Sequence, residues 1–163
     1  MNKIILGMLF FVSTGSLAGD NIIEKRLLAK TMFDRSIVEL SKQEAACKAE
    51  RKILPVEKIR TLGITKKEQA IALQYYYSKA MLNCSDEQLK NYLVASALLN
   101  VLDKNQRAAT ESGNELIIQS HIDYLNSEIK FNTLTAETKA KLANVKELLQ
   151  PFEPMIAAKA LGL

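Results

Sequence analysis

The chain has 163 residues, a formal net charge of +4, two cysteines and one histidine. A chain of this length suits one domain with its own hydrophobic core. The charge is only mildly basic and does not by itself indicate a partner. After the first apolar segment no run is long enough to form a membrane helix, so the mature chain is expected to be soluble.

Residues 1–18 have the pattern of an export signal that is removed from the mature protein. Lys3 supplies the positive start, residues 4–12 the apolar core, and residues 16–18 a small-x-small cleavage site. An uncleaved membrane anchor is the alternative, but the apolar core is shorter than the about 20 residues that span a bilayer. The mature chain, 19–163, is then one helical domain that is periplasmic or secreted.

The segment from Asp20, an N-cap residue type, to about Leu54 has the periodicity of a helix. One face recurs at steps of three and four residues and comprises Phe33, Ile37, Leu40, Glu44 and Cys47. Pro55 ends this helix or begins the next one. A short turn over 56–62 follows, and Gly63 is placed to cap its C-terminal end.

Thr65 and Glu68 have the spacing of a capping box, so a second helix is predicted from there to about residue 83. Cys84 is in phase with the apolar face of this helix, as Cys47 is with that of the first. Two packed faces would bring the thiols within bonding reach, and two lone exported cysteines most simply form one disulfide. Free thiols and an intermolecular bridge are the alternatives. The bond would close a loop of 37 positions, worth about 4 kcal/mol in chain entropy.

The stretch 84–102 is predicted to form the buried centre of the protein. Ser85 and Gln88 repeat the capping-box spacing, so a third helix is expected to begin here. Residues 89–102 are apolar nearly all round, a pattern typical of a helix enclosed by others. Residues 106–114 are polar and contain Ser-Gly-Asn, which indicates either a loop or a frayed helical extension.

Two further helices complete the predicted fold. The apolar stripe of the fourth, which ends near residue 132, comprises Ile118, Ile122, Leu125 and Ile129. Thr135 is expected to cap the fifth, whose stripe comprises Leu142, Val145 and Leu149. Pro151 and Pro154 end it before a last turn over 155–161. Without any strand alternation, the sequence predicts an all-α fold: a single compact bundle of about five helices with one disulfide.

Few residues offer catalytic or metal-binding chemistry. His121 is the only histidine, and the helix positions that would pair with it, 117, 118, 124 and 125, hold no second metal ligand. The cysteines lack the CxxC spacing of a redox motif. No nucleophile elbow and no phosphate-binding glycine loop occur. We therefore expect no catalysis, no metal and no cofactor.

A basic segment, 48–67, is the first feature that indicates binding. It holds seven basic and two acidic residues, and Arg51, Lys58 and Arg60 are its candidate contacts. Such a patch attracts an acidic protein or an anionic lipid surface. A solvated connection between helices is the alternative.

A tyrosine triplet, Tyr75-Tyr76-Tyr77, is the second feature. Successive helix residues point about 100° apart, and Tyr77 lies on the apolar stripe. Tyr75 or Tyr76 is therefore expected nearer the surface, where tyrosine suits a protein interface. The alternative, with both rings packed against neighbouring helices, is equally open.

These features favour a non-catalytic exported protein that binds another protein in the cell envelope, as an inhibitor, immunity factor or adaptor. Tyr75, Tyr76, Arg51, Lys58 and Arg60 are the predicted contacts. An anionic-lipid or envelope-surface binding protein and a periplasmic chaperone are the alternatives. Nucleic acid is disfavoured because the basic segment has no stacking aromatic residues. The oligomeric state is left open.

Overall fold

The computed structural model describes the backbone of residues 16–163, and the side chains from residue 21 onward except those at 107–109, 112 and 116. The predicted export signal, 1–18, therefore lies largely outside the described residues. The α-helices are α1 (Ser16–Ala49), α2 (Glu57–Arg60), α3 (Lys66–Leu102), α4 (Arg107–Asn132), α5 (Ala136–Ala143) and α6 (Pro154–Leu161). Two short 3-10 helices, Lys104–Gln106 and Lys146–Leu149, lie between them. Within this range the only strand-like pairing is a single bridge between Lys52 and Phe152, so the predicted all-α class is confirmed.

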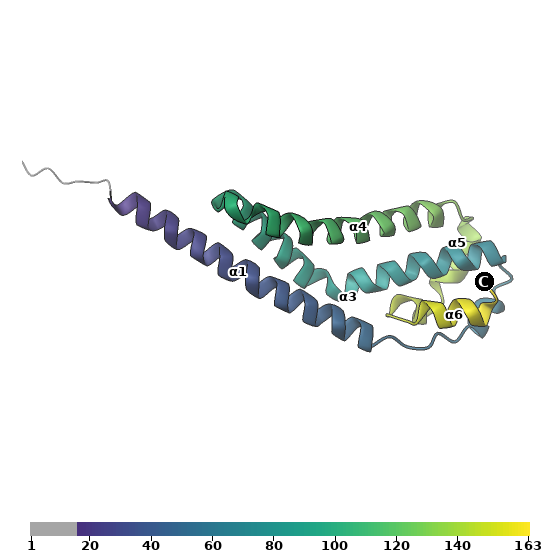
Figure 1. Ribbon diagram of the computed structural model, residues 1–163. Helices are drawn as coiled ribbons and strands as arrows, with labels where there is room; N and C mark the ends of the chain where they lie inside the picture. The colour runs from purple at the N-terminus through teal and green to yellow at the C-terminus, as the bar shows by residue number, and fades with distance from the viewer. Residues whose placement is uncertain (1–15) are drawn as a thin grey trace, which may run out of the picture.

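Three long helices give the protein an elongated shape (Figure 1). Both α1 and α4 pack along α3, which is the central element. The short helices α2, α5 and α6 gather at one end of α3, where the chain also ends (Figure 1). At the other end the Arg26 side chain of α1 donates a 2.7 Å hydrogen bond to the Leu102 carbonyl. The contact between α1 and α3 therefore extends to the last turn of α3.

The predicted helix start at Ser85 is wrong, because α3 passes through this position without a break. The Ser85 hydroxyl donates to the Met81 carbonyl one turn earlier, at 3.3 Å, instead of capping a new helix. A capping box acts at the start of a helix, where the first backbone N–H groups have no carbonyl partner within the helix. Inside a continuous helix those N–H groups already bond to the preceding turn. Here the preceding turns are held in place by the Cys47–Cys84 bond and the contact with α1.

The disulfide is as predicted. Cys47 and Cys84 are bonded, with their Cα atoms 6.0 Å apart, and the bond joins the last turns of α1 to the middle of α3. Gln43 adds a 2.9 Å hydrogen bond from its side-chain amide to the Cys84 carbonyl. This pair of links fixes where the two helices cross.

The hydrophobic core is divided between the two ends of α3. The larger cluster, where the short helices meet α3 and α4, includes Leu54, Ile59, Tyr76, Phe131, Leu142, Leu148, Phe152 and Leu161. The smaller cluster lies between the three long helices and includes Phe33, Leu40, Leu89, Tyr92 and Leu99. The predicted burial of 89–102 on all sides is wrong, since Leu93, Val94, Leu98 and Val101 are exposed. Only α1 and α4 cover this part of α3, so one face of it remains in contact with solvent.

Several local predictions are confirmed. Thr65 and Glu68 form the capping box of α3, and Gly63 adopts the left-handed conformation at φ +66° just before it. Thr135 caps α5 through a 3.1 Å bond from the Thr138 amide.

The predicted end of the fifth helix at Pro151 and Pro154 is wrong, because α5 ends at Ala143 and Lys146–Leu149 form a separate 3-10 helix. Pro154 is instead the first residue of α6, where its missing amide hydrogen costs nothing.

Residues 107–114 belong to α4, so of the two alternatives for 106–114 the helical extension is confirmed and the loop is wrong. The polar side chains of this segment bond to α3 instead of turning the chain. Asn114 accepts a 3.2 Å bond from Ser96, and Thr110 donates to Asn100. Tertiary hydrogen bonds thus override the local turn preference of Ser-Gly-Asn.

Candidate functional site

A groove lies between α1 and α4, with α3 as its floor. Its main part has a volume of about 420 Å³ and is lined by Ile37, Leu40, Ser41, Glu44, Tyr92, Gly113, Ile117 and Ser120. A second part, of about 300 Å³, adjoins it toward the disulfide end and also includes Glu44 and Ser120. These shared residues make one continuous feature, the α1–α4 groove. It exists because α1 and α4 both pack on α3 rather than mainly on each other.

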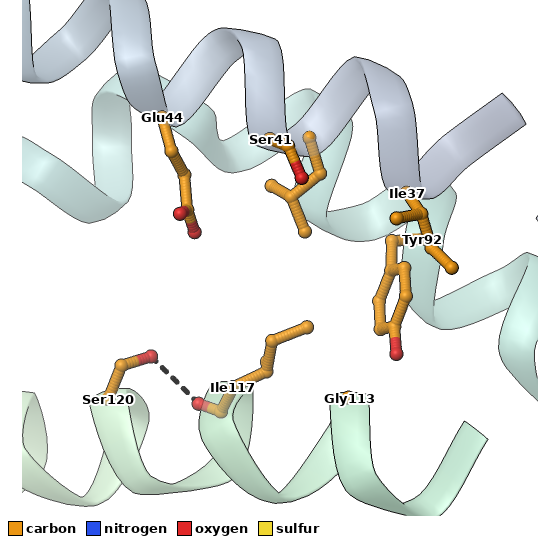
Figure 2. A pocket seen from close by; sticks show the side chains of 8 residues that line it. Ile37, Ser41, Glu44, Tyr92, Gly113, Ile117 and Ser120 are labelled. Carbon is orange, nitrogen blue, oxygen red and sulfur yellow. Dashed lines mark hydrogen bonds between the residues drawn. The ribbon is translucent and has the colours of Figure 1, made fainter. Parts of the chain in front are cut away.

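The main part of the α1–α4 groove is largely apolar. Leu40 of α1 and Tyr92 of α3 are buried in its floor, and Ile117 of α4 is half-buried beside them. In Figure 2 the Tyr92 ring stands across the gap with its hydroxyl toward Gly113. A side chain at Gly113 would overlap that hydroxyl, so the glycine makes room for the ring. The Phe33 ring packs on the far side of Tyr92, with the ring centroids 5.6 Å apart.

The Tyr92 hydroxyl is buried and has no hydrogen-bond partner among the described residues. Burial away from water disfavours the phenolate and raises the pKa of Tyr92. The hydroxyl therefore stays protonated at physiological pH and can donate a hydrogen bond. Its position beneath Gly113 makes it part of the floor of the groove rather than a reactive group.

Polar side chains line the rim of the α1–α4 groove. In Figure 2 the Glu44 carboxylate projects from α1 into the gap toward α4. No described residue forms an ion pair with it. On the opposite wall the Ser120 hydroxyl donates to the Ile117 carbonyl of its own helix at 2.8 Å, and Asp123 accepts a 3.0 Å bond from Gln119. The main part of the groove thus combines an apolar floor with an unpaired carboxylate, a lining that suits an apolar group carrying a positive charge. Lys48 lines the second part, toward the disulfide.

Sequence reasoning placed Glu44 on a helix face but not in a site. The signal was present, because an acidic residue lies in phase with Phe33, Leu40 and Cys47, which are all buried. A carboxylate on an apolar face marks the edge of a groove or a buried charge. No sequence signal identified Ser120 or Asp123, since their relation to α1 depends entirely on how the helices pack.

The predicted tyrosine contacts lie in the core and not in the groove. Tyr75 and Tyr76 are 7% and 5% exposed, so of the two open alternatives the one with both rings packed against neighbouring helices holds. The Tyr75 ring stacks on Phe131 with centroids 4.1 Å apart, and Tyr76 meets the same ring edge-on at 5.4 Å. Helices pack on more than one side of α3 here, so rings that point 100° apart are both covered. Neither ring offers exposed area to a partner.

The predicted basic contacts form ion pairs within the chain. Arg51 lies 3.2 Å from Glu153, Lys58 pairs with Glu147, and Arg60 pairs with Glu57 and also donates to the Ala160 carbonyl. They join the segment around α2 to the C-terminal part of the chain, beside the Lys52–Phe152 bridge. None of the three lines the α1–α4 groove. Because these basic side chains are paired with carboxylates, they attract an anionic surface less than the number of basic residues in 48–67 suggests.

His121 and the acidic residues do not assemble into a metal site. The His121 Nδ1 atom lies 2.9 Å from the Ile117 carbonyl oxygen and bonds within its own helix. Among the described residues no group of three histidine, cysteine, aspartate or glutamate side chains could hold a metal ion. No helix in the described part of the chain combines the length and the hydrophobicity of a membrane span.

A second surface lies on α4 away from the groove. The stripe predicted to face the core, Ile118, Ile122, Leu125 and Ile129, is exposed, which corrects the expectation. The core is contacted instead by Tyr124, Ser127 and Phe131. We call the exposed residues the α4 row.

Comparisons of this chain with protein-family models, with curated proteins and with solved structures found no match.

Proposed function

We propose that this is an exported, non-catalytic protein that binds another protein of the cell envelope, and that it holds a helical segment of this partner in the α1–α4 groove. The observation that carries the proposal is the groove itself, which combines an apolar floor with the unpaired Glu44 carboxylate. Export is supported by the N-terminal pattern and by the Cys47–Cys84 bond, which is the kind of link that persists in an oxidising compartment.

A helix is the occupant that the groove suits best. The groove lies between α1 and α4, which run in the same general direction and draw apart toward their C-terminal ends (Figure 1). A helix laid in the groove would contact both walls and the floor. Amphipathic helices bind in such grooves through apolar side chains spaced at three and four residues. Ile37 and Ile117 would contact those side chains from either wall, and Glu44 would pair with a lysine or arginine beside them. The expected partner is therefore an amphipathic basic helix.

Affinity capture from envelope extract with the mature protein tests this proposal. Ser41→Trp fills the main part of the groove and Glu44→Lys reverses its charge, so both variants are expected to lose the captured partner. Lys42→Trp, on the adjacent exposed position of α1, and Glu87→Lys, on exposed α3, are the matched controls and should retain it. Equal capture by all five proteins would refute the groove as the binding site.

Two further measurements distinguish the alternatives. A periplasmic chaperone would suppress aggregation of unrelated denatured proteins, with no single captured partner. An anionic-surface binder would sediment with acidic vesicles and dissociate as salt rises. Either result, combined with unchanged behaviour of Ser41→Trp, would replace the present proposal.

A further inference from the structure

The α4 row has the spacing of a helix-pairing seam. Ile118, Ile122, Leu125 and Ile129 follow one another at steps of four, three and four, which is the a/d pattern of a coiled coil. They are 56%, 43%, 51% and 65% exposed, and no other described part of the chain covers them. Four consecutive seam positions filled only by isoleucine and leucine are unusual on a solvated helix face.

The residues beside the row are polar and differ between its two edges. His121 and Glu128 lie along one edge, and Gln119 and Asn126 along the other. At these four flanking positions the ionisable groups lie on one edge, while Glu115 takes the next seam position before Ile118. His121 and Glu128 are seven residues apart, which is one coiled-coil repeat, so both flank the seam at the same heptad position.

We propose that the α4 row is the contact surface of a homodimer, in which α4 pairs antiparallel with α4 of a second copy about a two-fold axis. In this arrangement Ile118 lies against Ile129 of the second copy and Ile122 against Leu125, so every member of the row is covered by another member. His121 lies opposite Glu128 of the second copy, and the symmetry makes this contact twice. A parallel pair would set His121 beside Asn126 and leave Glu128 without a basic neighbour.

A second copy fits better than an unrelated helix because the surface complements itself. A two-fold interface places the same patch on both subunits, so each feature must find its counterpart within the patch. The row satisfies this for shape, since its side chains are of nearly equal size, and for charge, through His121 and Glu128. The dimer would also leave both α1–α4 grooves open, because Gly113, Ser120 and Asp123 face away from the row on α4.

The oligomeric state of the mature protein tests the proposal. Light scattering coupled to size exclusion, at about 100 µM, should give twice the chain mass if the dimer has micromolar affinity or better. Ile122→Lys/Leu125→Lys should be monomeric with an unchanged circular dichroism spectrum, because both residues are already largely exposed. Ile53→Lys, at an exposed apolar position outside α4, should remain dimeric. A monomeric wild type, or a dimer that survives the double substitution, would overturn the proposal.

Charge exchange tests the orientation. Glu128→Lys should weaken the dimer by about tenfold, because it sets lysine against His121 of the second copy. His121→Glu/Glu128→Lys places a carboxylate against an ammonium group across an antiparallel contact and should recover the dimer. The double substitution also loses the hydrogen bond that Glu128 accepts from Tyr124, so recovery cannot come from within the subunit. Failure to recover would exclude the antiparallel pairing.

Discussion

The contact between Gly113 and Tyr92 gives the sharpest test of how α4 packs on α3. A Cβ atom at Gly113 would overlap the Tyr92 hydroxyl, while the next nearest ring atom, Cζ, lies at 3.3 Å. The ring cannot swing away freely, because Tyr92 is buried and packs on Phe33. The hydroxyl, and not the ring, is therefore what excludes a side chain from position 113.

Three substitutions separate these effects. Gly113→Ala gains about 1 kcal/mol of helix propensity but loses about 1–3 kcal/mol to overpacking, so we expect a net loss of about 1 kcal/mol. Tyr92→Phe removes a buried hydroxyl without a described partner, which costs about 1–3 kcal/mol to bury, so it should be neutral or stabilising. With both changes the overlap disappears and the propensity gain remains.

Urea unfolding of the wild type and the three variants measures these free energies. We expect the double variant to be at least as stable as Tyr92→Phe alone, with a coupling of about 1 kcal/mol or more between the two sites. Additive effects, within about 0.5 kcal/mol, would refute the reasoning, because they would show that the hydroxyl does not limit position 113.

Three further predictions concern stability. Cys47→Ala/Cys84→Ala should lower the free energy of unfolding by about 4 kcal/mol, because the loop of 37 residues is released in the unfolded chain; a urea midpoint shifted by less than about 0.5 M would contradict this. Thr135→Ala removes the cap of α5 and should cost about 1 kcal/mol in the same assay, and an unchanged midpoint would show that the cap contributes nothing. Hydrogen bonds from Thr65 hold the pKa of Glu68 below its usual range. Glu68→Gln should therefore destabilise the protein at neutral pH, and the difference from wild type should vanish as pH falls through the lowered folded pKa of Glu68; a difference that persists at low pH would exclude the charged form as the cause.

The features that could be predicted from the sequence are those decided within a few residues. Thr65 and Thr135 were correctly identified as helix caps because a cap needs only a hydroxyl and the amide three residues ahead. Gly63 was correctly predicted to follow the short turn, because glycine adopts the left-handed backbone conformation that commonly ends a turn, regardless of the tertiary surroundings. The disulfide was found because each cysteine is in phase with the apolar stripe of its own helix, and only two cysteines are present.

The candidate site could not be predicted in the same way. The α1–α4 groove depends on two helices that share α3 as a neighbour, and no residue pattern within α1 or α4 records that arrangement. Only Glu44 indicated the groove in the sequence, because it is a charged residue on an otherwise apolar helix face. The predicted contacts Tyr75, Arg51, Lys58 and Arg60 were chosen for residue type, and the fold uses these types for packing and internal ion pairs.

The sequence by itself determined the caps at Thr65 and Thr135, the disulfide between Cys47 and Cys84, and the all-α class. Only the tertiary structure decided that α3 runs unbroken past Ser85, that Tyr75 and Tyr76 are covered, and that the α4 row faces solvent. The physical reason is the range of the interactions. Caps and helical periodicity act over three or four residues, whereas the burial of a helix face depends on how many neighbours pack against it, and α3 has too few neighbours to enclose the apolar surface that its sequence provides.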